Sequence, residues 1–233
     1  MNINKALTSL VFTILATFTI PAFAGGTAVL EAGSGANRIN TTIEFNDGNM
    51  RMGTAVPGFD GYMVMTETGI YMVTGMGGRP MVLDLGAMMS LMGGMAGEMM
   101  QSQGISLNNG IGQFIEMRDA GRNEAVAGVP GLVYDLTYAN EQGTRQTEEI
   151  VLGRDATLRE LTETLATWGR MMAAYLSVDL SEYQGAMDDL LQYGDGILRL
   201  GSGYRLVSLD ETAPDPARFT LPAAPQQMPS WMP

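Results

Sequence analysis

Two residue types are missing from this chain: its 233 residues include no histidine and no cysteine. Without imidazole or thiolate groups, the chain has no Ser-His-Asp triad, no cysteine nucleophile and no ordinary zinc site. Disulfides are excluded as well, so stability must come from packing alone. These two absences remove the side chains that form many catalytic and metal-binding sites.

Lysine is nearly absent too, because Lys5 is the only one in the chain. Residues 25–233 contain 12 arginines and 25 acidic residues, which gives a net charge of −13. Such a chain is repelled by nucleic acids and by anionic membranes, and we expect no nucleic-acid partner. The acidity is interpreted as a solubility feature.

Familiar catalytic motifs are also missing. The glycine-rich stretch 75–78 is followed by Arg79 and Pro80 rather than by a helix, and it lacks the lysine of a phosphate-binding loop. The acidic pair 148–149 lies in an expected strand, where neighbours face opposite ways, and the pair 188–189 lies on a solvated helix face. We therefore expect no enzyme, no catalytic residue and no cofactor.

Residues 1–24 are typical of an export signal. Lys5 precedes an apolar run at 6–20, and an A-x-A cleavage site follows at 22–24. The run is shorter than the roughly 20 residues of a membrane span, and no cysteine follows it for a lipid anchor. We expect a protein without a stable membrane anchor, located in the periplasm, with secretion as the second choice.

Alternating apolar residues predict antiparallel hairpins in the first part of the chain. The strands 39–45 and 50–52 flank an Asn-Asp-Gly-Asn turn, and the strands 62–66 and 70–74 flank a second turn. Another strand is expected at 80–85. In the strand 62–66 both faces are apolar, because two methionines alternate with a tyrosine and a valine, so each face needs a cover.

Methionine is the abundant residue, with thirteen among the 51 residues from position 50 to position 100. After residue 85 apolar side chains recur every three or four residues, which predicts a helix. Four glycines in the same stretch weaken such a helix by about 1 kcal/mol each. We therefore expect a weak helix that needs a partner surface. Its apolar stripe consists of Leu85, Met88, Met92, Met95 and Met99.

The second half of the chain predicts more strands and then two helices. In the strand 132–139, Leu132, Tyr134, Leu136 and Tyr138 share one face. The helix from 157 to 175 begins with a capping box formed by Thr157 and Glu160, and another helix runs from 181 to 193. The remaining strands are expected at 114–118, 124–127, 144–152, 197–200 and 204–209.

This order of elements indicates an α+β fold. We expect a curved antiparallel sheet, an unclosed half-barrel, with the methionine-rich helix inserted and the late helix pair packed on its concave face. Residues 1–24 are the signal peptide, residues 25–222 form a single domain, and residues 223–233 form a disordered proline-rich tail.

The methionines allow three interpretations. A flexible thioether side chain commonly fills gaps in a core or lines a site for irregular apolar ligands. Thioether sulfur is also a soft ligand for Cu(I) or Ag(I), and the Met-x-x-Met spacings at 89–92 and 92–95 fit that use. Exposed methionines can instead consume oxidants by forming sulfoxides. Packing or ligand lining is favoured, and no metal ligand is assigned.

Four segments together resemble the LolA-like family of periplasmic lipoprotein and lipid carriers. They are 47–52 (DGNMRM), 69–73 (GIYMV), 124–134 with its two glycines at 128 and 131, and 219–222 (FTLP). The similarity spans most of residues 25–222 and also extends to an uncharacterised branch of exported proteins. It implies an unclosed barrel that holds a cavity of acyl-chain size capped by helices.

We therefore expect a soluble, non-catalytic periplasmic carrier for a hydrophobic, acyl-chain-type ligand. The alternatives are a Cu(I)/Ag(I)-binding protein that uses methionine thioethers, or a non-catalytic protein that interacts with another envelope protein. For the carrier, the expected partner is a lipid or another hydrophobic small molecule. The expected ligand-binding residues are Met63, Met65, Met72, Met88, Met92, Met95, Met99, Tyr134, Trp168 and Met172.

Overall fold

One antiparallel sheet organises the chain in the computed structural model, which describes residues 25–33, 35, 38–53, 61–76, 78–92, 113–139, 143–178 and 181–226. Within these residues the sheet has 11 strands in the order β6-β5-β4-β3-β2-β1-β11-β10-β9-β8-β7. The strands are β1 (Gly26–Ala32), β2 (Ile39–Asn46), β3 (Asn49–Gly53), β4 (Gly61–Thr66), β5 (Gly69–Met76), β6 (Arg79–Asp84), β7 (Gln113–Val126), β8 (Val129–Ala139), β9 (Arg145–Gly153), β10 (Gly196–Leu200) and β11 (Tyr204–Asp210).

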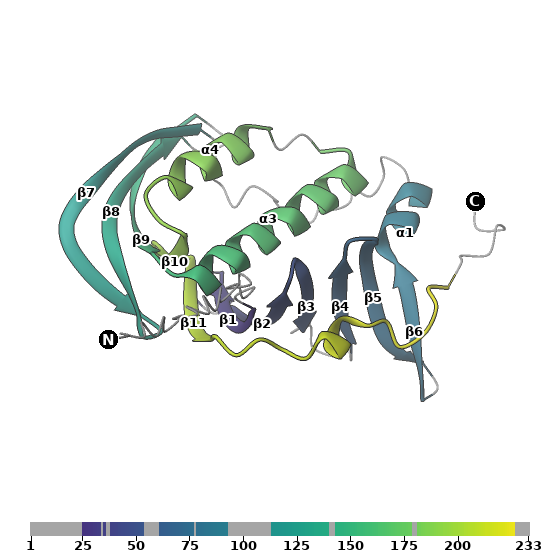
Figure 1. Cartoon of the computed structure of the whole chain (residues 1–233). Coiled ribbons are helices and arrows are strands. Elements are labelled where there is room, and N and C mark those ends of the chain that lie inside the picture. Colours follow the sequence, from purple (N-terminus) through teal and green to yellow (C-terminus); the bar gives the residue numbers. More distant parts are fainter. Residues whose placement is uncertain are drawn as a thin grey trace, which may run out of the picture.

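The strand order consists of two meanders that meet at one pair of strands. Strands β1 to β6 follow one another along the sheet, and so do β7 to β11. The two series are joined where β1 pairs with β11, for example at Ala28 opposite Leu209. Strands β6 and β7 are the two edges, so the sheet does not close. The α+β class with a curved antiparallel sheet is confirmed, and Figure 1 shows the curvature most clearly in β7 to β9.

Several hairpins lie where the alternation of apolar residues predicts them. The turn between β2 and β3 uses Asp47 (φ 52°) and Gly48 (φ 71°), a left-handed pair that matches the twist of the flanking strands. The turn between β7 and β8 uses Ala127 (φ 54°) and Gly128 (φ 82°) in the same way. The sequence leaves residues 128–131 between the expected strands 124–127 and 132–139, but the turn lies earlier than that and Pro130 belongs to β8. The expected strands 114–118 and 124–127 are one bulged strand, β7.

Three α-helices are present in the described part of the chain: α1 (Leu85–Met92), α3 (Ala156–Leu176) and α4 (Ser181–Leu191). The predicted capping box at the start of α3 is wrong. Asp155 is the cap, and its side chain accepts hydrogen bonds from the N–H groups of Thr157 and Leu158. Glu160 serves another purpose: its Oε1 accepts the N–H of Asp47 at 2.8 Å, which ties the helix to the β2–β3 turn.

Helix α3 crosses one face of the sheet, contacting β10, β1, β2 and β5, and reaches α1 at its far end (Figure 1). Beneath it lies the largest core cluster, which we call the inner cluster. Its buried members are Ala28, Leu30, Ile43, Phe45, Met50, Met65, Ile70, Leu85, Val126, Val133, Val151, Leu158, Leu161, Met172, Leu198 and Leu206. Helix α4 packs elsewhere, through Leu190, on the face of β8 and β9 that carries Tyr134, Leu136 and Ile150. The predicted common face of Leu132, Tyr134, Leu136 and Tyr138 is confirmed by this second cluster.

The C-terminal segment covers the opposite face of β4 to β6. Leu221 packs against a third cluster that contains Val64 and Val73, while Phe219, in the short 3-10 helix η2 (Pro216–Phe219), is buried. At residue 226 the backbone N–H donates to the carbonyl of Val82 at 2.8 Å. Within the expected disordered tail, Gln226 is therefore bridged to β6, and residues 227–233 are outside the described part.

A carboxylate–arginine group fastens this segment to the sheet. Glu44 on β2 accepts hydrogen bonds from Arg218 of η2 and from Arg51 of β3, and the Arg51 guanidinium lies 4.0 Å from the ring centre of Tyr62. Burial of Glu44 opposes its ionisation, but the bonds from both arginines outweigh this and hold the pKa of Glu44 below its ordinary value.

The first prediction concerns this group. Because the folded pKa of Glu44 is lowered, its contribution to stability is present above the ordinary carboxyl range and is lost as pH falls through the lowered value. We expect Glu44→Gln to reduce the free energy of unfolding at neutral pH by about 1–2 kcal/mol. The variant should also lose less stability than the parent between about pH 5 and pH 3.

Urea unfolding at several pH values measures both effects. Glu31→Gln is the matched control, because Glu31 pairs with Arg38 at 2.9 Å in a more exposed setting and should change stability by less than about 1 kcal/mol. Equal losses of stability in the Glu44 and Glu31 variants would contradict the proposal that Glu44 fastens the C-terminal segment to the sheet.

Candidate functional site

Two parallel rows of side chains cross strands β2 to β5 on the face below α3. The first consists of Phe45, Met50, Met65 and Ile70, which are opposite one another in successive strands. All four are at most 1 % exposed, so this row is a filled core. It lies directly beneath α3, whose Leu161 belongs to the same inner cluster.

The second row lies two residues further along each strand and therefore on the same face. It contains Met52 of β3, Met63 of β4 and Met72 of β5, and register places each directly opposite the next. We call these three residues the methionine row. Each is only half-buried although it packs against the inner cluster. The face below α3 thus changes from a filled core to a partly open thioether surface within two residues.

The helices supply the other wall of this surface. Helix α3 contributes Trp168 and Met171, and α1 contributes Met88 and Met89, all half-buried against the inner cluster. The two helices approach closely at Gly86, where an added Cβ would lie 2.8 Å from the ring of Tyr175. Glycine is needed there because any side chain would force α1 away from α3.

The structure brings together six of the ten residues expected to bind a ligand. Met65 (1 % exposed) and Met172 (7 %) are core residues of the inner cluster. The half-buried members are Met63, Met72, Met88 and Trp168.

Of the other four expected residues, one lies in another cluster and the side chains of three lie outside the described part of the chain. Tyr134 belongs to the second cluster, where its ring meets that of Tyr193 edge to face at 5.5 Å between centres. The side chain of Met92 and all of Met95 and Met99 lie outside the described residues. Three further methionines of this assembly, Met52, Met89 and Met171, were not among the residues expected to bind a ligand.

Trp168 carries an unusual polar atom. Its indole Nε1 is buried, and no hydrogen-bond acceptor is found for it among the described residues. Most residues of the inner cluster have hydrocarbon or thioether side chains, which are poor acceptors, and its tyrosines make no hydrogen bond to this nitrogen. Trp168 was among the residues expected to bind a ligand, but nothing in the sequence indicated that its donor would be unpaired.

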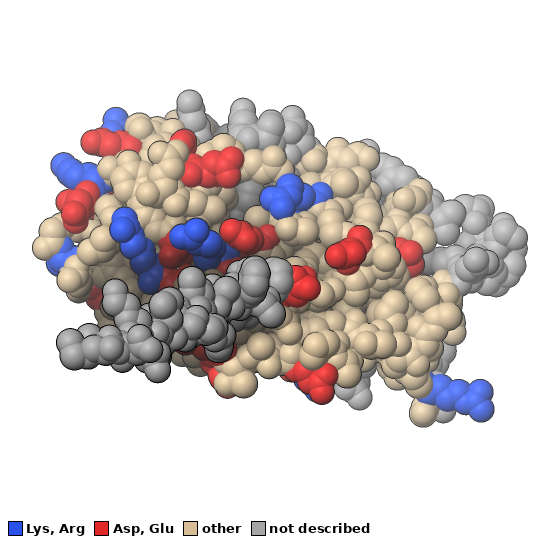
Figure 2. Space-filling view, in the orientation of Figure 1, with Lys and Arg blue, Asp and Glu red and all other residues tan. Residues whose placement is uncertain are grey.

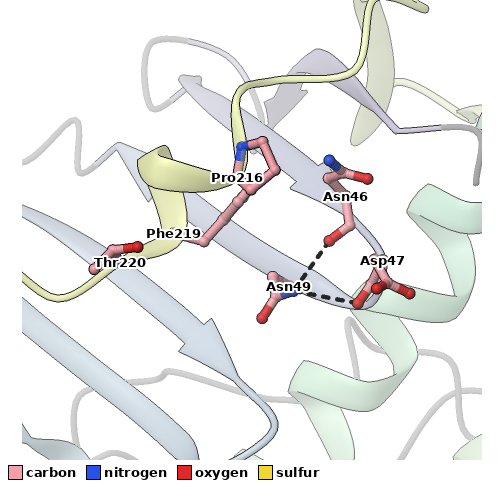
Figure 3. A pocket seen from close by; sticks show the side chains of 6 residues that line it. All are labelled: Asn46, Asp47, Asn49, Pro216, Phe219 and Thr220. Carbon is pink, nitrogen blue, oxygen red and sulfur yellow. Dashed lines mark hydrogen bonds between the residues drawn. The ribbon is translucent and has the colours of Figure 1, made fainter.

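A separate pocket of about 340 Å³ lies between the β2–β3 turn and η2 (Figure 3). Polar groups line much of it, and the amide of Asn49 donates to the carbonyls of Asn46 and Asp47. The amide of Asn46 donates to the carbonyl of Pro214 at 3.2 Å. Because these donors bond to neighbouring carbonyls, the pocket offers few free groups to a ligand, and it does not include the methionine row.

Charged side chains gather elsewhere. Arg199 of β10 donates to Glu124 of β7 and to Glu149 of β9, and Arg122 also pairs with Glu149. Hydrogen bonds from Arg199 lower the pKa of Glu124, so this group stays ionised at neutral pH. On the face seen in Figure 2, charges of both signs lie mainly toward the β7–β11 end, whereas the part over β3–β6 and α1 carries few.

The described residues contain no group of three or more acidic side chains that could hold a metal ion. Within the same residues, no helix is long and apolar enough to cross a membrane. Comparisons with protein-family models, with curated proteins and with solved structures found no match for this chain.

The second prediction compares the two rows. Met65→Ala should lower the free energy of unfolding by about 2–5 kcal/mol, because it leaves a cavity in a filled core. Met63→Ala on the same strand should cost clearly less, about 1–2 kcal/mol, because its side chain is partly exposed already. Urea denaturation of both variants measures the difference. Equal costs would mean that the methionine row is as tightly packed as its neighbour.

Proposed function

We propose that this protein is a periplasmic carrier for an acyl-chain-type hydrophobic ligand, built as a LolA-like half-barrel with helices over one face. The ligand lies between the methionine row and the wall formed by α1 and α3. The observation that carries this proposal is the half-buried row Met52–Met63–Met72 beside a fully buried row on the same face. Location in the periplasm rests on the export signal expected in residues 1–24.

The chemistry of the surface suits such a ligand. Thioether side chains are unbranched and polarisable, so they adapt to an acyl chain whose position is not fixed by polar contacts. Each methylene group that leaves water on this surface contributes about 0.8 kcal/mol to binding. The small number of charges over β3–β6 and α1 on the face in Figure 2 is consistent with an apolar cargo.

Helix α1 is the part most suited to move when a ligand binds. Its described part has eight residues against 21 in α3, so displacement of that part exposes less core. It begins directly after β6, where the side chain of Asp84 accepts the N–H of Ala87 at 2.9 Å. Separation of α1 from Tyr175 would widen the gap over the methionine row without disturbing the filled row beneath α3.

The third prediction tests the carrier. Met63→Glu and Met72→Glu should each weaken binding of a fluorescent fatty-acid probe at least about tenfold, because a carboxylate on this surface is desolvated by the acyl chain. Native mass spectrometry of the gently purified parent protein should show co-purifying lipid.

Val207→Glu is the matched control, since Val207 lies on β11 and is 45 % exposed. Circular dichroism checks that all three variants fold. If the parent protein binds no probe and carries no lipid, the carrier proposal is wrong. If the Val207 variant loses binding as strongly as the other two, the ligand does not lie on the methionine row.

A Cu(I) or Ag(I) site is the second candidate, and one observation favours it. Residues directly opposite one another in antiparallel strands have Cβ atoms about 4.5–5.5 Å apart, and methionine side chains are long and flexible. The sulfurs of Met52, Met63 and Met72 can therefore converge on one soft cation, for which thioethers are suitable ligands.

The fourth prediction separates the two functions. Met63→Leu keeps the apolar volume and removes one sulfur, so lipid binding should change by less than about twofold under the carrier proposal. A metal site should instead lose affinity at least about tenfold for the same change. Anaerobic titration against a competing Cu(I) chelator, repeated with Ag(I), measures the second quantity. Met65→Leu in the buried row is the control and should leave metal affinity unchanged.

A further inference from the structure

Among the described residues, two buried side-chain nitrogens have no hydrogen-bond partner: Arg51 Nε and Trp168 Nε1. A buried donor without an acceptor is destabilising and rare in folded proteins, so each example requires an explanation. For Arg51 the surroundings supply one. Its guanidinium donates through another nitrogen to Glu44 at 3.2 Å and lies over the ring of Tyr62.

Trp168 has no comparable compensation. It has a single polar atom, and this atom is a donor that cannot accept. Its neighbours on the same side of α3 are Leu165, Met171 and Met172, which pack with it against the inner cluster, and the buried Thr164, whose hydroxyl makes no hydrogen bond to the indole. The indole and the methionine row pack against the same inner cluster, and the N–H group of the indole is buried there without an acceptor.

We propose that Trp168 Nε1–H donates a hydrogen bond to a carbonyl or carboxylate oxygen at the head of the bound ligand. This inference rests on the proposed carrier function and makes it more specific. The ligand is then an acyl compound, a fatty acid or a fatty-acyl ester, and not a plain hydrocarbon. Its chain lies along the methionine row, which crosses three strands and spans about 10 Å.

The methionine row and Trp168 would make two different kinds of contact with the ligand. The methionine row supplies adaptable apolar contact that scales with chain length and does not fix the position of the chain. A single directional hydrogen bond fixes one end and gives specificity, as in other ligand sites where a few polar groups orient a mostly apolar molecule. Trp168 satisfies its own donor only when such a ligand is present.

The experiment compares Trp168→Phe with the parent protein, using three fluorescent polyene probes of similar size. One probe is a fatty acid (cis-parinaric acid), one is its methyl ester, and one is a hydrocarbon without an acceptor (diphenylhexatriene). We expect Trp168→Phe to bind the acid and the ester about three- to tenfold more weakly and the hydrocarbon with unchanged affinity. Trp231→Phe is the matched control, since residue 231 is the only other tryptophan.

A spectroscopic readout separates hydrogen bonding from packing. The carbonyl stretch of a ¹³C-labelled fatty-acid methyl ester should lie at lower frequency in the parent protein than in Trp168→Phe, because a hydrogen bond weakens the C=O bond. Unchanged binding of the hydrocarbon probe shows at the same time that the variant is folded.

The outcomes are distinguishable. Loss of acid and ester binding together identifies the carbonyl as the acceptor, and loss of acid binding alone identifies the free carboxylate. Equal weakening of all three probes, or weakened ester binding with an unshifted ester carbonyl band, would show that Trp168 acts only through its ring, and the inference would fail while the carrier stands. If the parent binds none of the probes, both the inference and the carrier fail.

Discussion

The packing of helix α3 on the sheet is the contact on which the rest of the structure depends. The two meanders join where β1 pairs with β11, and α3 begins beside this pair. At Gly26 an added Cβ would lie 2.6 Å from the carbonyl oxygen of Asp210 and 2.9 Å from Thr157 of the helix, so only glycine allows this approach. From there α3 runs to β5 and α1, and one helix thereby braces both halves of an unclosed sheet.

This arrangement explains why one face of the sheet is fully buried in one row of side chains and only half-buried in the next. Directly below α3, the row that contains Met50 and Met65 is filled, because a 21-residue helix with Leu161 and Met172 on its lower side covers it. Two residues further along the strands, the methionine row is only half-buried, and α1 packs on β5 and β6 at the edge of the sheet. A core that supports the fold and a surface suited to a ligand can therefore be neighbours on the same strands.

Much of the local structure was predictable. Period-two alternation placed Met63 and Met65 on one face, and the inner cluster contacts both, whereas Val64 belongs to the third cluster on the other face. Three features were missed for physical reasons. The strand β1 has a glycine start and no polar alternation, η2 is a short 3-10 segment, and Asp155 displaced the expected cap because its carboxylate reaches two N–H groups.

The sequence alone determined the composition of the site: thioethers in the strands that became β3, β4 and β5, no histidine or cysteine, and an apolar helix stripe that includes Trp168. Alternation is a property of each strand, so it can be seen without knowing the partners. Only the tertiary structure decided that Met52, Met63 and Met72 form a row, that Tyr134 belongs to another cluster, and that the Trp168 donor is unpaired. The register of neighbouring strands, the burial of a sheet face by helices and the pairing of a buried donor all arise from contacts between residues far apart in the chain. No local sequence pattern encodes such contacts.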